Sequence, residues 1–239
     1  PYIGGVRRTR DCYPRLGCWG KVMDTLKKIP IVLFTAIVIS GCQVDVTADL
    51  YSEDLLTTDA NTRFPATLEI EIPSCSSTDR ESTELEILSI FSSQANAEIS
   101  GCREEGFKSL LAVRFEGEIA SEESNFDLVV FRNRNADGNR YFTAALTQGF
   151  RTRMNTLLDN NMQKLDHSDL TLTVNLRHDL DQIADYFLIA GWVNDDPGQY
   201  VSGEIAKRDS VQLRFSNLIS DMVLRNDQPI LFFLNSADN

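Results

Sequence analysis

Apolar and polar residues alternate along many short stretches of this 239-residue chain, and a period of two is typical of β-strands with one buried face. The clearest case is 44–51, whose apolar positions are Val44, Val46, Ala48 and Leu50. Alternation and short apolar runs predict further strands at 66–72, 95–100, 108–119, 126–133, 140–147, 170–178, 185–193 and 229–234, with a hairpin inside 199–216. The pattern therefore predicts a fold built mainly on sheet.

Two segments have a helical period instead. Residues 78–93 suit a helix because Thr78 is a good N-cap and Glu81 completes a capping box. Residues 148–165 repeat apolar side chains every three or four positions, which predicts a second helix with one buried face. Two main helices among many short strands favour an α+β fold with a mostly antiparallel sheet.

The predicted elements follow the same order, strand-strand-helix-strand-strand, in 44–119 and again in 125–193. This order is compatible with two tandem ββαββ-like units, which would make 44–119 and 125–239 sub-units of one region. The alternative is a single continuous sheet with both helices on one face.

An apolar run ends abruptly near residue 42. From Met23 the sequence reads MDTLKKIPIVLFTAIVISGC, in which two lysines precede the apolar stretch 29–39. This is the composition of a secretory signal peptide, and the stretch is shorter than the roughly 20 residues that span a bilayer. We therefore expect 23–41 to be a signal peptide and 1–22 to be upstream sequence translated in the same frame.

The last residues of that segment, Ile39-Ser40-Gly41-Cys42, resemble a bacterial lipobox. The resemblance implies cleavage before Cys42, acylation of that cysteine and a mature α+β domain over 42–239. Several acyl chains give a stable membrane anchor, which a single chain does not. Gln43 follows the cysteine, and this resembles the pattern of lipoproteins sent to the outer membrane. The expected location is the cell envelope, with the domain facing the periplasm.

The mature segment is strongly acidic. Residues 1–41 hold seven of the 23 Lys/Arg and two of the 35 Asp/Glu, so 16 basic and 33 acidic residues remain, a net charge of −17. Such a surface repels nucleic acid, so nucleic acid is not an expected partner.

Three cysteines remain after cleavage, and Cys42 is assigned to lipid. In an oxidising compartment the other two, Cys75 and Cys102, are expected to form a disulfide. A metal site is not expected, because neither His167 nor His178 lies at ligand spacing from a cysteine.

Positive charge is concentrated in one stretch, 126–158, which has five basic and two acidic residues. All five basic residues are arginines: Arg132, Arg134, Arg140, Arg151 and Arg153. Guanidinium groups bind phosphate and carboxylate bidentately, so this arginine island is a candidate anion site. It is equally compatible with docking onto an acidic surface, or with ordinary solvated surface.

The same stretch contains NRNADGN at 133–139, which resembles the start of an EF-hand loop. Ala144 stands where that loop needs a bidentate glutamate, so we interpret the sequence as a hairpin turn.

Motifs of known enzyme classes, such as G-x-S-x-G or H-E-x-x-H, do not occur. The carboxylate pairs Asp179/Asp181 and Asp195/Asp196 are interpreted as solvated loop residues. Trp192, with its neighbours Tyr186 and Phe187, is interpreted as core. The sequence therefore predicts a protein that is not an enzyme and needs no cofactor.

The segment CQVDVTADLYSEDLL, followed by FPATLEIEIPSC, resembles the opening of an uncharacterised family of Gram-negative envelope lipoproteins. The resemblance covers Cys42 to Cys75 and implies residence in the envelope without implying an activity. The function expected is a membrane-tethered protein-interaction, exclusion or accessory factor with an envelope protein as partner. The alternative is a binding module for a small anionic envelope ligand, using the arginine island.

Overall fold

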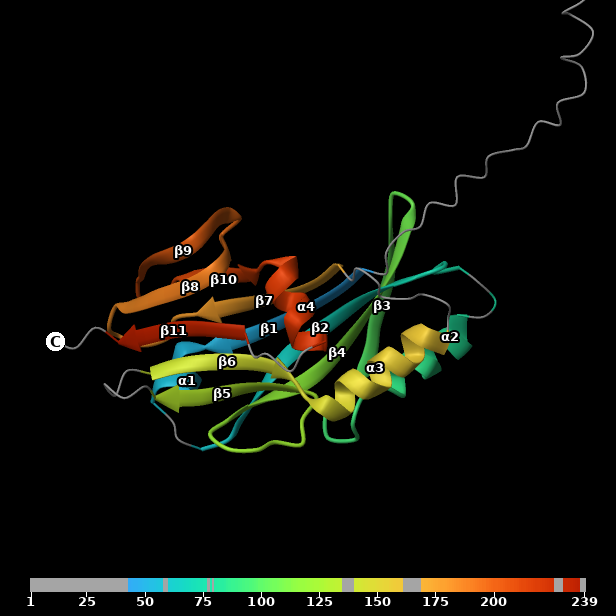
Figure 1. The fold of residues 1–239 in the computed structure, drawn as a ribbon, viewed down its shortest axis with the longest axis horizontal. Helices are drawn as coiled ribbons and strands as arrows, with labels where there is room; N and C mark the ends of the chain where they lie inside the picture. Colours follow the sequence, from blue (N-terminus) through green and yellow to red (C-terminus); the bar gives the residue numbers. More distant parts are fainter. Residues whose placement is uncertain are drawn as a thin grey trace, which may run out of the picture. The chain divides into compact units, whose positions relative to one another are not determined.

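The computed structural model describes residues 43–57, 60–76, 78, 80–134, 140–160, 169–225 and 230–236. These residues form eleven strands and four helices (Figure 1). The strands are β1 (Gln43–Tyr51), β2 (Thr62–Ile72), β3 (Glu98–Glu105), β4 (Lys108–Ala120), β5 (Leu128–Arg134), β6 (Arg140–Leu146), β7 (Asp169–Arg177), β8 (Ala184–Val193), β9 (Asp196–Ile205), β10 (Ser210–Phe215) and β11 (Ile230–Ser236). The helices are α1 (Ser52–Leu56), α2 (Arg80–Leu88), α3 (Gln148–Asn160) and α4 (Asn217–Arg225).

The strands form one sheet in the order β10-β7-β1-β2-β4-β5-β6-β11-β8-β9, and β3 pairs with β4. Because β10 also pairs with β8, nine strands close into a barrel, while β3 and β9 are attached to its wall. The expected α+β fold, an antiparallel sheet with two main helices, is therefore wrong. The described helices are short, and the sheet buries its apolar face by curling onto itself instead of covering it with helices.

The two stretches that share an element order are not tandem ββαββ units. β1 pairs in parallel with β7 along its whole length, from Gln43↔Asp169 to Tyr51↔Arg177. β4 also pairs in parallel with β5 over three residue pairs that begin at Glu118↔Val129. Strands from both stretches are thus neighbours in one closed sheet.

The barrel is closed by a short contact between β8 and β10, which runs from Leu213↔Val193 to Phe215↔Gly191. The earlier part of β8 pairs with β11. Ala190 lies between the two parts with a φ of 53°, a left-handed conformation that is unusual for a residue with a side chain. This kink lets one edge of β8 serve two neighbours in succession.

Helix α4 continues the wall where β10 ends. β10 pairs with β7 only as far as Arg214↔Thr173, so the next amide on β7, that of Leu172, has no ladder partner on that side. Its N–H donates to the fully buried Ser220 hydroxyl of α4 at 3.1 Å. The helix therefore satisfies a backbone donor that the sheet leaves open.

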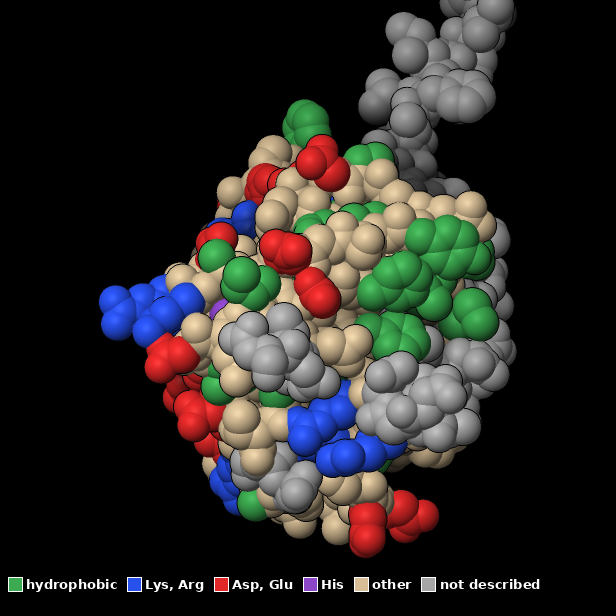
Figure 2. Space-filling view, turned by 90° about the vertical axis from the view of Figure 1, so that its left-hand side faces the viewer, with side chains coloured by type: hydrophobic (Ala, Val, Ile, Leu, Met, Phe, Trp, Pro, Cys, Tyr) green, Lys and Arg blue, Asp and Glu red, His purple; other side chains and the backbone are tan. Residues whose placement is uncertain are grey.

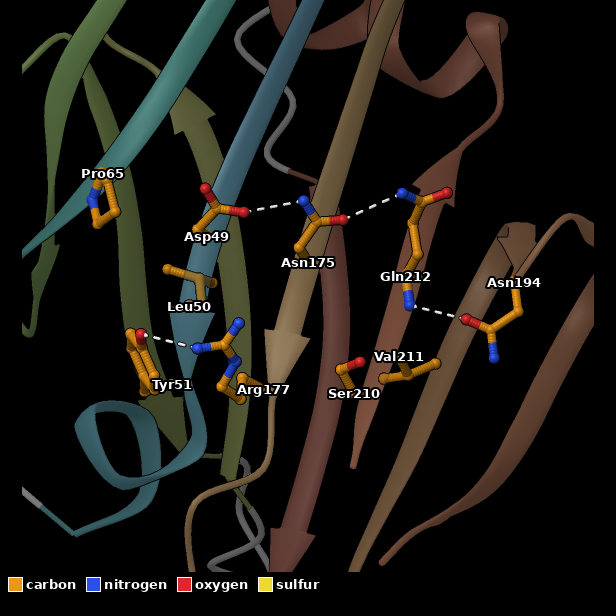
Figure 3. Close-up of a pocket in the computed structure, with 10 residues that line it drawn as sticks. All are labelled: Asp49, Leu50, Tyr51, Pro65, Asn175, Arg177, Asn194, Ser210, Val211 and Gln212. Carbon is orange, nitrogen blue, oxygen red and sulfur yellow. Dashed lines mark hydrogen bonds between the residues drawn. The ribbon is translucent and has the colours of Figure 1, made fainter. Parts of the chain in front are cut away.

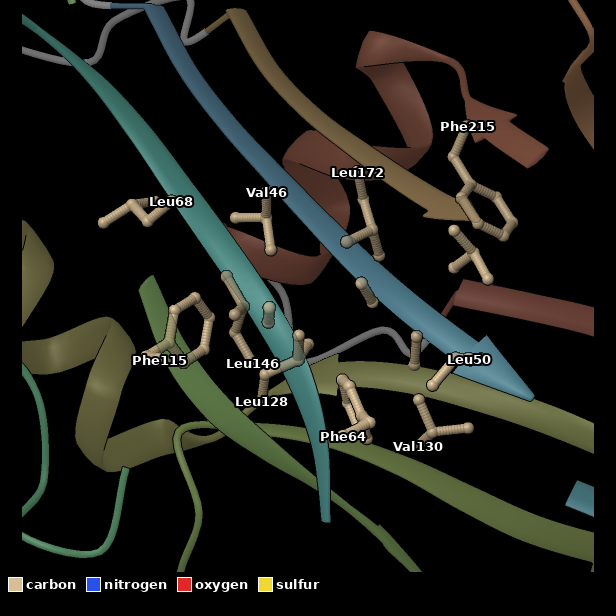
Figure 4. Close-up of a cluster of buried hydrophobic side chains, with 14 of the residues drawn as sticks. Val46, Leu50, Phe64, Leu68, Phe115, Leu128, Val130, Leu146, Leu172 and Phe215 are labelled. Carbon is tan, nitrogen blue, oxygen red and sulfur yellow. The ribbon is translucent and has the colours of Figure 1, made fainter. Parts of the chain in front are cut away.

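The core fills the inside of the barrel (Figure 4). β1 alternates between buried and half-exposed positions, as its sequence predicts, and contributes Val46 and Leu50 to the interior. Leu68, Phe115 and Leu172 from neighbouring strands meet them. Period-two patterning thus produces a single interior shared by strands from both halves of the chain.

The first predicted helix, 78–93, ends earlier in the structure than the sequence predicts. α2 ends at Leu88, and Phe91 beyond it is buried, with its ring 5.0 Å from that of Phe115 and 5.3 Å from that of Phe150 on α3. The final part of the predicted helix 148–165 lies outside the described residues. α4 was not predicted at all.

The expected disulfide is present: Cys75, in the loop after β2, is bonded to Cys102 on β3. The proposed lipidation site, Cys42, lies outside the described residues, as do the predicted signal peptide and upstream segment. Within the described ranges no helix has both the length and the apolar character needed to cross a membrane.

Candidate functional site

The inner face of the barrel changes from apolar to cationic at the end where β5 stops and β6 begins. The inward positions of β5 are Leu128, Val130, Arg132 and Arg134. Those of β6, from its far end, are Leu146, Ala144, Phe142 and Arg140. Each inward row therefore begins in the core and ends in arginine, and this end of the barrel is called the mouth below.

A cavity of about 220 Å³ opens at the mouth. It is lined by Arg132, Arg134 and Arg140, with Leu55, Ser121, Asn133 and Phe142. Figure 2 views the molecule from this side and shows Lys/Arg side chains gathered near the middle of the face. Three of the five arginines of the predicted island thus converge on one concave site. Barrel mouths are common positions for ligand sites.

Arg132 is fixed by the backbone of α1 and the loop after it. Its Nη2 donates to the carbonyl oxygen of Asp54 at 2.8 Å and to that of Ala60 at 2.9 Å. Its Nε also donates to the Asp54 carbonyl, at 3.3 Å. These bonds hold the guanidinium plane at the cavity wall, so its orientation is set before any ligand arrives.

Arg134 and Arg140 face each other directly across the β5–β6 hairpin. Arg134 is exposed and Arg140 is half-buried, and the structure places no described carboxylate in an ion pair with either. Like charges at directly opposed positions destabilise a strand pair. An anion held between the two guanidinium groups would remove that repulsion.

One carboxylate lies close to this site. Burial and the charge of Asp179 raise the pKa of Asp54 above its usual 3.8, while the charge of Arg132 opposes the shift. The ionised Asp54 offsets part of the positive charge at the mouth.

The other two arginines of the island have a structural role on α3. Arg153 Nη2 donates to Asp127 Oδ1 at 2.6 Å, and its Nε donates to the Ile90 carbonyl. The Asp127 side chain is 1% exposed and also accepts the Ser92 N–H at 2.7 Å. Arg151 is buried and donates to Gln148 Oε1 at 2.6 Å. The predicted island is therefore divided between a concave site and a helix anchor.

Asp127 and Arg151 both have perturbed pKa values. Burial raises the pKa of Asp127, although the Ser92 amide and Arg153 act in the opposite direction. Burial lowers the pKa of Arg151. Both shifts follow from the removal of charged groups from water, which is the cost of anchoring α3 through polar side chains.

A serine–histidine pair connects α1 to the end of β7. His178 Nε2 contacts the Gln182 carbonyl, which only accepts, so Nε2 is the donor there, and Nδ1 is hydrogen-bonded to the Ser52 hydroxyl at 2.9 Å. Both Ser52 and His178 have no exposed surface. A substrate would have no access to the hydroxyl, so the pair acts as a structural link.

A second hollow, of about 480 Å³, lies on the outer face of β1, β7 and β10 (Figure 3). Asn175 donates to Asp49 Oδ1 at 2.8 Å, and Gln212 Nε2 donates to Asn175 Oδ1 at 3.1 Å. The Gln212 backbone N–H donates to Asn194 Oδ1 at 3.0 Å. These polar groups are hydrogen-bonded to one another across the strands. The hollow is therefore a hydrogen-bonded part of the barrel wall, and these groups are not oriented toward a ligand.

The outer face of the sheet also has a stripe of four aromatic residues: Tyr141, Phe233, Phe187 and Tyr200, on β6, β11, β8 and β9. Consecutive ring centroids are 5.9, 5.8 and 6.1 Å apart. The first three residues are half-buried, and Tyr200 is 65% exposed. Figure 2 shows apolar side chains gathered on one side of its face.

The prediction that Trp192, Tyr186 and Phe187 are core therefore needs correction. Phe187 belongs to the outer stripe, and Trp192 is half-buried with the Arg214 guanidinium 5.0 Å from its ring centroid. Tyr186 packs partly buried against the core.

Sequence reasoning missed the roles of Leu55 and Phe142 at the mouth. One signal for the mouth was available, because Arg132 and Arg134 continue the every-second-residue row of Leu128 and Val130. The sequence contains no comparable signal for the aromatic stripe, because its four residues are brought together by the pairing of strands that are far apart in the sequence.

Comparison with known proteins places the chain in a family without assigning it an activity. No curated protein matches it significantly. A family described as a domain of unknown function matches residues 44–237, which is most of the chain and includes every described residue after Gln43. The chain therefore belongs to the DUF7424 family.

Proposed function

We propose that the protein is a lipid-anchored binding protein of the bacterial envelope, not an enzyme, and that its barrel mouth binds an anionic group. The observation that carries the proposal is the direct opposition of Arg134 and Arg140 across one cavity without a described carboxylate partner. The anchor is supported by the lipobox-like sequence that ends at Cys42.

The chemistry of the cavity defines the class of ligand. Opposed guanidinium groups match the oxygens of a phosphate or a carboxylate, and each can donate two parallel hydrogen bonds. Leu55 and Phe142 add apolar wall, which suits a small organic molecule that ends in such a group. The acidic surface repels anions at long range, so we expect binding to depend on these close contacts.

Isothermal titration calorimetry of the purified protein with sulfate, inorganic phosphate, a phosphomonoester and acetate tests the proposal and separates phosphate from carboxylate ligands. Because a hydrogen bond to a charged group is worth about 1.5–3 kcal/mol, Arg140→Ala should weaken binding about ten- to a hundredfold. Arg114→Ala is the matched control, since Arg114 is an exposed arginine on β4 that lies 3.7 Å from the exposed Glu98 and away from the cavity lining. Equal affinity in the two variants, or no anion binding in the wild type, would refute the proposal.

The aromatic stripe supports a second candidate function, the binding of an envelope protein. Aromatic residues are enriched at protein interfaces, and Tyr200 is highly exposed at the outer strand β9. A photo-crosslinking residue at position 200 should give one defined adduct in cells, and the same residue at position 114 should not. Absence of an adduct at 200, or equal adducts at both positions, would contradict this candidate.

A further inference from the structure

The tip of the β3–β4 hairpin exposes an apolar side chain completely. Glu105 pairs with Lys108, so the loop consists of Gly106 and Phe107 alone. Gly106 has a φ of 62°, which a glycine adopts without strain and which makes this tight turn possible. The relative exposure of Phe107 is 109%, the highest among the large apolar residues of the described chain. Turns favour Gly, Asn, Asp and Ser, and a phenylalanine side chain that is fully exposed adds nothing to the packing of the fold.

This tip lies at the same end of the sheet as the start of β1. The ladder places Val44 opposite Ile70, and Ile70 opposite Leu111 on β4. β1 and β4 each run antiparallel to β2, so they run in the same direction. Phe107 precedes Leu111 by four residues, which places the tip about 13 Å beyond the level of Val44 at about 3.3 Å per residue.

A side-chain contact ties the tip to the first described residue. Lys108 Nζ donates to Gln43 Oε1 at 2.9 Å and lies 3.6 Å from Glu71 Oε2. Cys42, the proposed lipid-bearing residue, directly precedes Gln43 in the sequence. In the ladder direction Gln43 is one residue beyond Val44, whereas Phe107 is four residues beyond the same level.

We propose that the β3–β4 hairpin tip is a second membrane contact, in which Phe107 enters the interfacial layer of the bilayer that holds the lipid anchor. This inference rests on the proposed anchorage through Cys42. An acyl chain on the residue before Gln43 in the sequence would bring the membrane surface to this end of the sheet, and the tip extends farther in that direction than Gln43. Interfacial insertion to about 5–10 Å removes an apolar side chain from water. With both contacts made, the barrel is held in one orientation instead of swinging on its anchor.

The charges beside the tip indicate the kind of surface. Glu104 and Glu105 are exposed on the same hairpin, and Arg103 pairs with Glu105 and Glu69. The acidic residues disfavour an anionic surface, so the inference is for insertion into a zwitterionic bilayer.

Fluorescence of the mature lipidated protein in phosphatidylcholine vesicles tests the inference. In a Trp192→Phe background, Phe107→Trp should show blue-shifted emission and lose intensity when the lipids carry bromine on their acyl chains. Tyr200→Trp in the same background is the matched control, and its emission should change in neither way. A blue shift that grows with protein concentration without bromolipid quenching would show self-association through the tip and would overturn the inference.

Flotation of the same vesicles separates this inference from the anchor on which it rests. If wild type floats and Cys42→Ser does not, the anchor holds, and an unquenched Trp at 107 refutes the hairpin contact alone. If neither protein floats, or both float equally, the proposed lipid anchor fails.

Discussion

Arg153 on α3 and Arg140 on β6 belong to the same arginine-rich stretch, yet the fold gives them opposite surroundings. Arg153 reaches the buried carboxylate of Asp127 and the Ile90 carbonyl, so it fastens α3 to the barrel. Arg140 faces Arg134 across a cavity. The comparison teaches that local charge does not define the role of an arginine. The partner that the fold supplies decides whether the guanidinium serves stability or remains available to a ligand.

The strongest test of this contrast is Arg153→Ala. The substitution leaves the Asp127 carboxylate buried without its ion-pair partner, so we expect a loss of about 3 kcal/mol in the free energy of unfolding, measured by urea denaturation. Anion affinity should be unchanged because the mouth is made by other elements. Arg114→Ala, at an exposed pair, should cost less than about 1 kcal/mol. If Arg153→Ala lowers the free energy of unfolding by no more than Arg114→Ala does, Arg153 does not stabilise the fold.

Arg140→Ala should have the opposite effect on stability. Removing one of two opposed like charges should raise the unfolding free energy by about 0.2–1 kcal/mol in a dilute buffer without phosphate or sulfate. The gain should vanish in about 1 M sodium chloride, where charges are screened within about 3 Å. If Arg140→Ala is instead destabilising under both conditions, the two arginines do not repel each other as the register indicates.

The smallest expected effect concerns Asp54. This partly buried carboxylate lies beside the mouth, so it is neither a buried ion-pair partner like Asp127 nor absent like a carboxylate partner of Arg140 among the described residues. The pKa of Asp54 in the folded state is raised above 3.8. As pH falls through that pKa, the carboxylate takes up a proton and no longer offsets the positive charge of Arg132. Sulfate affinity should therefore rise a few-fold on acidification and fall again as pH increases. Calorimetry with sulfate is suitable because its charge is constant over this range.

Asp54→Asn is the control for this pH effect. It should bind sulfate at neutral pH as tightly as the wild type does in acid, with a flat pH profile. A variant that keeps the wild-type profile would show that another group causes the pH dependence.

The strand positions were predictable from the sequence to a large extent, because alternation is a local property. β1 and β7 lie within one residue of their predicted bounds at each end. One pair of carboxylates interpreted as loop residues is divided: Asn194 and Asp195 form the β8–β9 turn at φ values of 47° and 70°, whereas Asp196 is the first residue of β9. Asn and Asp adopt positive φ more readily than most residues, so Asn194 and Asp195 are suited to this turn.

Closure of the barrel was not predictable in the same way. It depends on three residue pairs between β8 and β10, on the kink at Ala190 and on α4 covering the edge of β7. None of these leaves a periodic trace in the sequence. The same limit applies to the site, since charge patterning identified the five arginines, but only the register of β5 and β6 separated the mouth from the α3 anchor.

The parallel pairing of β1 with β7 has a consequence for how the molecule is made. Paired residues in these strands are 126 positions apart, as in the hydrogen bond between Asp49 and Asn175. Because a chain is synthesised from its N-terminus, β1 is made long before β7. Contacts between residues this far apart in the sequence also form slowly. During that interval one edge of β1 remains a template for wrong pairings. We therefore expect the yield of native protein to fall as this edge stays uncovered for longer, and chaperones that shield the edge should raise that yield.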